Sequence, residues 1–311
     1  MILPLFGVII GITGLVLSAE RMVHGAAALA KIWRVPSWIV GLTIVAFGTS
    51  LPEFVVDVSS AIAGHDDIAI GTIVGSNVMN VLFIISVLAC IFPPVLNLQR
   101  GWVEIGFMMV IASTAALLMW QSNDLSRIDG LVLLTLFVMY SVYLLSQKRI
   151  DAESTESHQL KAWKAGAWVV VSAIGLMVCG QLTTSQAVQL AEVAGVSQAL
   201  ISLTIVALGT SLPELVTSAV AAIRKEAALS LGNIIGSFTL NIVIVLGVTS
   251  IIQPLQYSRD FDQDLYFMLA SIPLLTLAIT LFRYKFGRWS ALPLMLGCVT
   301  YFYLLFRLHL S

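Results

Sequence analysis

The stretch LTIVAFGTSLPE at residues 42–53 returns as LTIVALGTSLPE at residues 203–214, with only Phe47 against Leu208 changed. An internal repeat constrains the architecture before any single helix is considered. Each copy lies within an apolar run yet carries Gly, Thr, Ser, Pro and Glu, and such polar residues are costly to place in lipid. The repeat therefore predicts that a duplicated polar element carries the function of the chain.

The composition is typical of an integral membrane protein. Of the 311 residues, 59% are hydrophobic and 11% are charged, and the mean hydropathy is +0.97. A soluble core of this size does not need so much apolar surface. Ten apolar runs are each long enough to cross a hydrocarbon layer of about 30 Å. They are expected at residues 2–23, 36–63, 69–92, 102–120, 127–147, 163–182, 196–223, 227–252, 264–282 and 289–308.

The repeat extends over the whole chain. Adding 161 to each predicted span of the first half gives a span of the second half. Because each copy holds an odd number of spans, the second copy enters the membrane from the opposite side. We therefore predict an all-α integral membrane protein of ten transmembrane helices, built as two inverted five-helix repeats at 1–147 and 163–311. A cytoplasmic linker is expected at 148–162, and inverted repeats are typical of secondary transporters.

The distribution of Lys and Arg predicts the orientation. With the N-terminus outside, all 16 basic residues except Arg127, Arg259 and Arg307 fall in internal loops or at internal helix ends. Cytoplasmic loops carry the excess of positive charge. We therefore expect both termini on the external side of a plasma (inner) membrane, with lipid as the surrounding partner.

Each copy of the repeated stretch is expected to form a broken helix, the second and the seventh of the ten. Pro52 and Pro213 have no N–H, so each leaves a carbonyl of the preceding turn without its helical donor. Irregular backbone at membrane depth is tolerated where it lines a cavity. The side chains expected at these breaks are Thr49, Ser50 and Glu53 in the first half, and Thr210, Ser211 and Glu214 in the second. Such an all-oxygen set with carboxylates suits a hard cation such as Ca²⁺.

The third and eighth spans add a polar face to each half. Ser76 and Asn80 are four residues apart and lie on one helical face, as do Ser237 and Asn241. Glycines repeat at the same spacing, and small residues let helix backbones approach closely. We expect this approach at Gly71, Gly75, Gly232 and Gly236.

The two glutamates need a positive partner that the sequence does not supply. A charge at the bilayer centre costs at least about 2.5 to 3.5 kcal/mol, and every Lys and Arg is predicted near a helix end. A mobile cation can supply the missing charge to Glu53 and Glu214. Protonated, hydrogen-bonded carboxyls are the alternative.

The duplicated GTSLPE, followed by a GS pair four residues before Asn80 and Asn241, resembles the alpha-repeats of the cation/calcium exchanger superfamily, nearest its prokaryotic sodium/calcium exchanger members. The resemblance implies Ca²⁺ binding by Thr49, Glu53, Thr210 and Glu214. It implies sodium sites formed with help from Ser76, Ser237 and the carbonyls of Ala46 and Ala207. Asn80 and Asn241 match the remaining central positions. Members that need potassium carry Asp at the position of Asn241, so potassium dependence is not expected.

We therefore expect an antiporter that exchanges Na⁺ for Ca²⁺ by alternating access, and not an enzyme. A Ca²⁺/H⁺ antiporter is the alternative, and a cation channel is less favoured because inverted duplication suits alternating access better than a static pore. The cysteines and histidines are scattered without metal-ligand spacing, so no cofactor is expected. Neither nucleic acid nor an obligatory protein partner is implied.

Asp57 is the one strongly polar residue of the second span that the matching position, Ser218, does not share. It lies one helical turn, about 6 Å, from Glu53 on the predicted external side. It can act as a fixed charge that attracts cations, as an extra ligand, or as a protonated or hydrogen-bonded carboxyl. We expect an accessory residue that modulates cation affinity.

Overall fold

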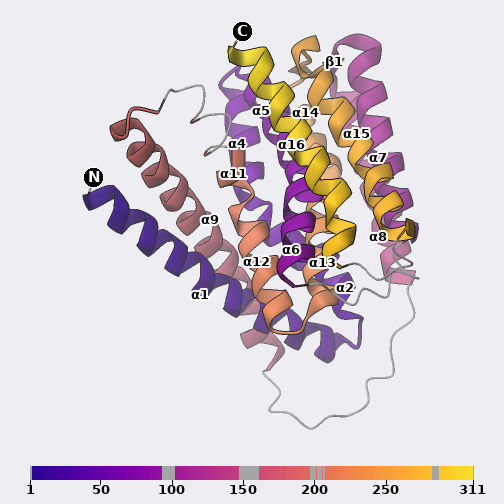
Figure 1. Cartoon of the computed structure of the whole chain (residues 1–311). Coiled ribbons are helices and arrows are strands. Elements are labelled where there is room, and N and C mark those ends of the chain that lie inside the picture. Colours follow the sequence, from indigo (N-terminus) through magenta and orange to yellow (C-terminus); the bar gives the residue numbers. More distant parts are fainter. Residues whose placement is uncertain are drawn as a thin grey trace.

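The computed structural model describes residues 2–92, 102–146, 161–196, 201, 205, 207–281 and 287–310. Within these ranges the chain is almost wholly helical (Figure 1). The first half contains α1 (Ile2–Trp33), α2 (Ser37–Val40), η1 (Gly41–Val45), α3 (Ala46–Thr49), α4 (Leu51–Ile62), α5 (Asp66–Val78), η2 (Met79–Ile84), α6 (Ile85–Ile91), α7 (Trp102–Ser122) and α8 (Arg127–Ser146). The second contains α9 (Ala162–Val193), α11 (Ala207–Thr210), α12 (Leu212–Ile223), α13 (Ala227–Leu240), η4 (Asn241–Leu246), α14 (Gly247–Ile252), η5 (Arg259–Phe261), α15 (Asp262–Leu281) and α16 (Arg288–Leu310).

Eight helices of the described part of the chain are long and apolar enough to cross a membrane. A ninth span is formed if the bent pair Ser37–Thr49 and Leu51–Ile62 is counted as one. The predicted span at 196–223 falls partly outside the described residues. Its described part contains the short helix α11 and the longer helix α12. The structure thus confirms a helical membrane fold. The total of ten spans stays a prediction.

The bounds of the helices repeat along the chain. Helix α4 (51–62) and α12 (212–223) begin and end 161 residues apart, and α8 and α16 begin 161 residues apart. The two long first helices, α1 and α9, both have 32 residues. The hydropathy repeat of the sequence therefore has a counterpart in where the helices begin and end.

Helices α1 and α9 pack side by side and slant away from the more upright helices α7, α8, α15 and α16 (Figure 1). Both continue about ten residues beyond the predicted spans at 2–23 and 163–182. The extension of α1 buries the small side chains Ala26 and Ala30 in one hydrophobic cluster, with Val220 of α12 among its members. This packing stabilises helix beyond the apolar run that defined the span.

A small two-stranded ladder is the one departure from an all-helical fold in the described residues. Strand β1 (Asp124–Leu125) pairs antiparallel with β2 (Leu255–Gln256). It joins the connection between α7 and α8 to the connection between α14 and α15. Both connections were predicted to lie on the external side, and their pairing requires them to share one side.

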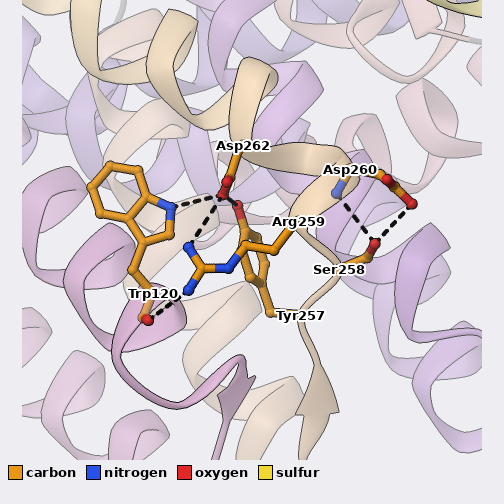
Figure 2. A network of polar contacts seen from close by, with 6 residues as sticks. All are labelled: Trp120, Tyr257, Ser258, Arg259, Asp260 and Asp262. Carbon is orange, nitrogen blue, oxygen red and sulfur yellow. Dashed lines mark hydrogen bonds and ion pairs between the residues drawn. The ribbon is translucent and has the colours of Figure 1, made fainter.

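A polar network reinforces this junction (Figure 2). The Asp262 carboxylate accepts from Trp120 Nε1 at 2.9 Å and from the Tyr257 hydroxyl at 2.7 Å. Arg259 lies 3.8 Å from the same carboxylate and donates to the Trp120 carbonyl at 3.0 Å. Burial and the adjacent Asp262 carboxylate raise the pKa of Tyr257 above its usual range, so its hydroxyl remains a donor.

Other contacts near the helix ends agree with the predicted side of the membrane for each connection. The Gln256 amide donates to Asp66 at 3.0 Å, and both residues were predicted to be external. Arg224 forms an ion pair with Glu20 at 2.6 Å, and both were predicted near the internal side. In both contacts, the two residues thus lie on the same predicted side of the membrane.

The broken helix of the first half lies between two hydrophobic clusters. Leu42 and Ala46 belong to the larger cluster, formed by the upright helices. Val40 and Val45 belong to the smaller one, formed with α1 and α9. The helix therefore has buried residues on both of these sides, and of the residues that follow Ala46, Phe47 is exposed whereas Gly48, Thr49 and Ser50 are buried.

Candidate functional site

The two repeated stretches break at matching serines. Ser50 (φ −84°, ψ 5°) separates α3 from α4, and Ser211 (φ −87°, ψ 3°) separates α11 from α12. The bend in the first half is 46°. Each new helix begins one residue before its proline, where the missing N–H costs no helical hydrogen bond.

Each glutamate lies in the first turn of the helix that follows the break, Glu53 in α4 and Glu214 in α12. The exposed N–H groups of a helix N-terminus favour negative charge. The break therefore provides partial compensation for each carboxylate. This effect reaches up to about 2 kcal/mol in partly buried geometries, which is less than the cost of burying the charge.

The helices opposite the breaks are locally widened. The π-helical segments η2 and η4 carry Asn80 and Asn241, respectively. Short π-helical turns interrupt the regular hydrogen-bond ladder and occur frequently at functional sites. Both predicted asparagines thus lie where the helix departs from α geometry, in matching places of the two halves.

The predicted ligands are buried in the middle of the molecule. Glu53, Glu214, Thr49, Ser237 and Asn241 have no exposed surface. The buried set also includes Ser50, Ser76, Asn80, Ser211 and Ala46. Thr210 is partly exposed, and the side chain of Ala207 lies outside the described residues. The structure therefore brings the predicted polar residues into the interior with the exception of Thr210.

Hydrogen bonds connect the two halves at this level. Thr49 Oγ1 lies 3.2 Å from Ser237 Oγ, and Asn241 Nδ2 donates to Ser76 Oγ at 3.3 Å. Ser50 Oγ donates to Glu214 Oε1 at 3.4 Å. Side chains separated by more than 160 residues thus form one polar site.

Several oxygen atoms of this site have no hydrogen-bond partner. They include both oxygens of Glu53, Oε2 of Glu214, the Ser211 hydroxyl and Oδ1 of Asn241. Glu53 and Glu214 are close enough that their carboxylates repel one another when both are ionised. Among the described residues, the ion pairs are Arg224 with Glu20 and Arg259 with Asp262, so neither glutamate has a cationic partner there. Buried charges are normally paired or coordinate a metal ion, and these oxygens fit a hard cation.

Neutral oxygens lie beside the two acids in this site. In the described part of the chain, no three His, Cys, Asp or Glu residues are close enough together to hold a metal ion. The oxygens gathered here are therefore those of two carboxylates together with hydroxyl, amide and carbonyl groups. A set of this kind holds an ion without burying further charge, which suits an ion that must also leave.

Comparison with known proteins identifies the family. The model of the sodium/calcium exchanger protein family matches residues 3–146 and 164–307. The chain belongs to this family. It is 33% identical to the putative antiporter CaxA of Alkalimonas amylolytica, over 98% of this chain and 99% of the relative. It is 34% identical to the inner membrane protein YrbG of Escherichia coli, over 84% of this chain and 85% of the relative.

The fold of this sodium/calcium exchanger family member matches a solved structure. It resembles the sodium-calcium exchanger NCX_Mj soaked with 10 mM Na⁺ and zero Ca²⁺, with a TM-score of 0.82 and 27% identity. The match covers 96% of this chain and 97% of that chain. The expected membership of the exchanger family, and hence transport and not catalysis, is confirmed. Proteins of this family exchange cations with Ca²⁺ across membranes, and Na⁺ and Ca²⁺ are their substrates.

The structure of this exchanger also shows site residues that the sequence analysis missed. Asn233 of α13 is fully buried and accepts from Thr49 Oγ1 at 3.1 Å. Asn77 of α5 is fully buried, and its Oδ1 lies 3.5 Å from Asn241 Nδ2. Both were missed because the polar faces of the third and eighth spans were assigned from residues shared by the two halves, and the positions that match Asn233 and Asn77 hold Thr72 and Phe238, respectively. A buried amide within an apolar span was the available signal.

Asp57 lies inside the exchanger, one turn after Glu53. It has no exposed surface, and neither carboxylate oxygen has a hydrogen-bond partner. The structure therefore does not show Asp57 hydrogen-bonded between helices, which was one of the alternatives. Its roles as a fixed charge, an extra ligand or a protonated carboxyl stay predictions.

Close helix packing brings α13 to the broken helix. A Cβ atom on Gly232 would overlap the Trp38 carbonyl, and one on Gly236 would overlap the Leu42 carbonyl. The predicted close approach is thus confirmed for these two glycines. For Gly71 and Gly75 the matching partner stretch falls largely outside the described residues, and their role stays a prediction.

Proposed function

We propose that this protein is an antiporter that exchanges Na⁺ for Ca²⁺ by alternating access. The observation that carries the proposal is the pair Glu53 and Glu214, which are fully buried at matching helix breaks and have no cationic partner among the described residues. Membership of the sodium/calcium exchanger family supports the choice of ions. The two carboxylates balance the charge of one Ca²⁺.

The proposed ligands divide by ion. Ca²⁺ is held by Glu53, Glu214, Thr49 and Thr210, since carboxylate and hydroxyl oxygens are the donors that this hard cation prefers. Na⁺ positions are formed with help from Ser76, Ser237 and the carbonyls of Ala46 and Ala207. The remaining proposed ligands are Ser50, Ser211, Asn80 and Asn241, which lie at the same breaks and widened segments.

The proposed architecture is ten transmembrane helices in two inverted repeats, 1–147 and 163–311, joined by a cytoplasmic linker at 148–162. The matching bounds of α4 and α12 and the two stretches matched by the family model support this division. Inverted repeats allow the two halves to exchange conformations, which opens a central site to each side in turn. The complete burial of Glu53 and Glu214 corresponds to a closed step between these openings.

The proposed location is a plasma (inner) membrane with both termini external. The Lys and Arg distribution supports the orientation, and the name of the Escherichia coli relative, an inner membrane protein, supports the location. Reporter fusions active only in the cytoplasm test the orientation. A fusion at the C-terminus should be inactive, whereas one placed after Arg224 should be active.

Ion flux in proteoliposomes tests the proposed function. Ca²⁺ uptake is measured while Na⁺, K⁺ and H⁺ gradients are varied one at a time. An outward Na⁺ gradient at fixed pH should drive Ca²⁺ uptake, and K⁺ should be dispensable. Uptake that depends on the pH gradient and not on Na⁺ would show that H⁺, and not Na⁺, is the coupling ion. Flux without saturable counterflow would indicate a channel.

A further inference from the structure

Asn233 connects the two halves of the site through its amide group. Its Nδ2 donates to Ser218 Oγ at 2.9 Å and lies 3.5 Å from the Glu214 carbonyl. Its Oδ1 accepts from Thr49 Oγ1 at 3.1 Å. Since Asn233 has no exposed surface, its amide is held entirely by protein groups.

The neighbours of Asn233 determine which way its amide points. The Ser218 and Ser230 hydroxyls each donate to the other residue's carbonyl, at 3.3 Å and 2.8 Å. The single proton of Ser218 is used in this way, so its oxygen must accept from Asn233. A reversed amide would also place Oδ1 against the Glu214 carbonyl, and two acceptors repel. Nδ2 therefore faces Ser218, and Oδ1 faces Thr49.

This orientation determines what the Thr49 hydroxyl can do. A hydroxyl that binds a cation turns a lone pair to the ion and its proton away from it. The possible acceptors near Thr49 are the Ala46 carbonyl at 3.2 Å, Ser237 Oγ at 3.2 Å, the Glu214 carboxyl and Asn233 Oδ1. The first three belong to the proposed ligand set, so their lone pairs would face the ions when these are bound. Asn233 is the acceptor in this set that is not itself a proposed ligand.

We propose that Asn233 is a positioning residue that accepts the Thr49 proton and thereby presents the Thr49 lone pairs to the bound cation. This inference rests on the proposed function of the site. Ser230 and Ser218 fix the amide, the amide fixes the Thr49 proton, and Thr49 binds the ion. The series of hydrogen bonds therefore acts on cation affinity without touching the ion beyond Thr49.

The first half has no equivalent of this series. The positions that match Ser218, Ser230 and Asn233 hold Asp57, Ala69 and Thr72. The Thr72 hydroxyl donates to the Ile68 carbonyl of its own helix at 2.7 Å. The two halves of the site thus differ. The second half contains a neutral series of hydrogen bonds, and the first half contains an additional carboxylate at Asp57.

A double-mutant cycle on Ca²⁺ binding tests the proposal. Equilibrium binding of ⁴⁵Ca²⁺ is measured on the purified full chain in detergent, for wild type, Asn233→Ala, Thr49→Ala and the double variant. In the wild-type background Asn233→Ala should weaken Ca²⁺ binding about five-fold, which corresponds to the loss of one hydrogen bond. In the Thr49→Ala background the same substitution should change binding by less than about two-fold, because its effect passes through Thr49.

Two further variants separate positioning from general structural damage. Ser218→Ala keeps Asn233 but removes the acceptor that orients it, and it should weaken binding two- to three-fold by roughly the same logic, again only when Thr49 is present. Thr72→Ala removes the side chain at the matching position of the first half and should leave binding unchanged. If Asn233→Ala does not fold, the double-mutant cycle is measured with Ser218→Ala in its place.

Equal effects of Asn233→Ala with and without Thr49 would overturn the proposal, as would unchanged binding in the folded variant. Because Ca²⁺ binding in detergent involves no Na⁺ gradient, this outcome is independent of the ion that drives transport. Wild-type protein that does not bind Ca²⁺ would contradict the proposed function itself. The two failures are therefore distinguishable.

Discussion

Ser50 Oγ donates to Glu214 Oε1 at 3.4 Å, although 164 residues separate the two in the chain. The hydroxyl at the break of one half thus contacts the carboxylate at the break of the other. Neither half can form this site alone, because each supplies one carboxylate and part of the neutral oxygen set. The predictions that follow test the site and the packing that positions it.

Replacing either buried carboxylate by an amide should abolish Ca²⁺ transport. Glu53→Gln and Glu214→Gln keep the side-chain volume but remove one of the two negative charges that balance Ca²⁺. Uptake of ⁴⁵Ca²⁺ into proteoliposomes is expected to fall to background, with a normal elution profile in size-exclusion chromatography. Flux at the wild-type rate in either variant would refute the assignment of these ligands.

The Thr49→Ala and Thr210→Ala variants serve as matched controls for the glutamate variants. Each loses a neutral oxygen, and a water molecule can substitute for it. Both should therefore retain measurable uptake with a raised Ca²⁺ concentration for half-maximal rate.

Asp57→Asn should weaken cation affinity on the external side and leave the maximal exchange rate largely intact. The side chain is buried one turn after Glu53, and the proposed role is a fixed charge that attracts cations. Initial rates at varied external Na⁺ and Ca²⁺ measure it. Complete loss of exchange at saturating ion concentrations would show that Asp57 belongs to the central site.

Exchange should carry net charge if Na⁺ is the coupling ion. Two carboxylates neutralise one Ca²⁺, whereas the hydroxyl and carbonyl oxygens of both halves leave room for more than two Na⁺. An imposed membrane potential should therefore change the rate of Na⁺-driven Ca²⁺ uptake. A rate that does not respond to the potential would indicate electroneutral exchange.

Gly236→Ala should impair folding of the site. A Cβ atom at this position would overlap the Leu42 carbonyl and the Ala46 side chain, so α13 and η1 must move apart. Overpacking of this kind costs about 1 to 3 kcal/mol. Thermal stability in detergent and Ca²⁺ uptake should both fall. The control Gly106→Ala, where a Cβ atom meets no neighbour, should leave both unchanged.

Asp262→Ala should destabilise the junction between the two halves without changing ion affinity. The carboxylate accepts from Trp120 and Tyr257, and hydrogen bonds to a charged group contribute about 1.5 to 3 kcal/mol each. A lowered Tm in detergent is expected. Asp260→Ala is the control, because its exposed carboxylate accepts only from the adjacent Ser258. Equal Tm values for the two variants would contradict this role of the network.

The sequence by itself determined the membrane class, the repeated organisation and most of the candidate site. Hydropathy marks spans because backbone groups in lipid must be satisfied within a helix. Proline marks the breaks because it lacks the N–H that a helix interior requires. Glu53 and Glu214 were predictable for the same reason, since an unpaired acid within an apolar span is too costly to persist without a function.

Only the tertiary structure decided which side chains meet across the halves. The contacts of Asn233 with Thr49 and Ser218 depend on how α13 packs against two different helices, and no periodicity within α13 specifies that packing. The same holds for the β1–β2 ladder, whose two-residue strands have no pattern of their own. Long-range packing sets these contacts, because local sequence fixes where a helix begins, bends and ends, but not which neighbour its polar face will meet.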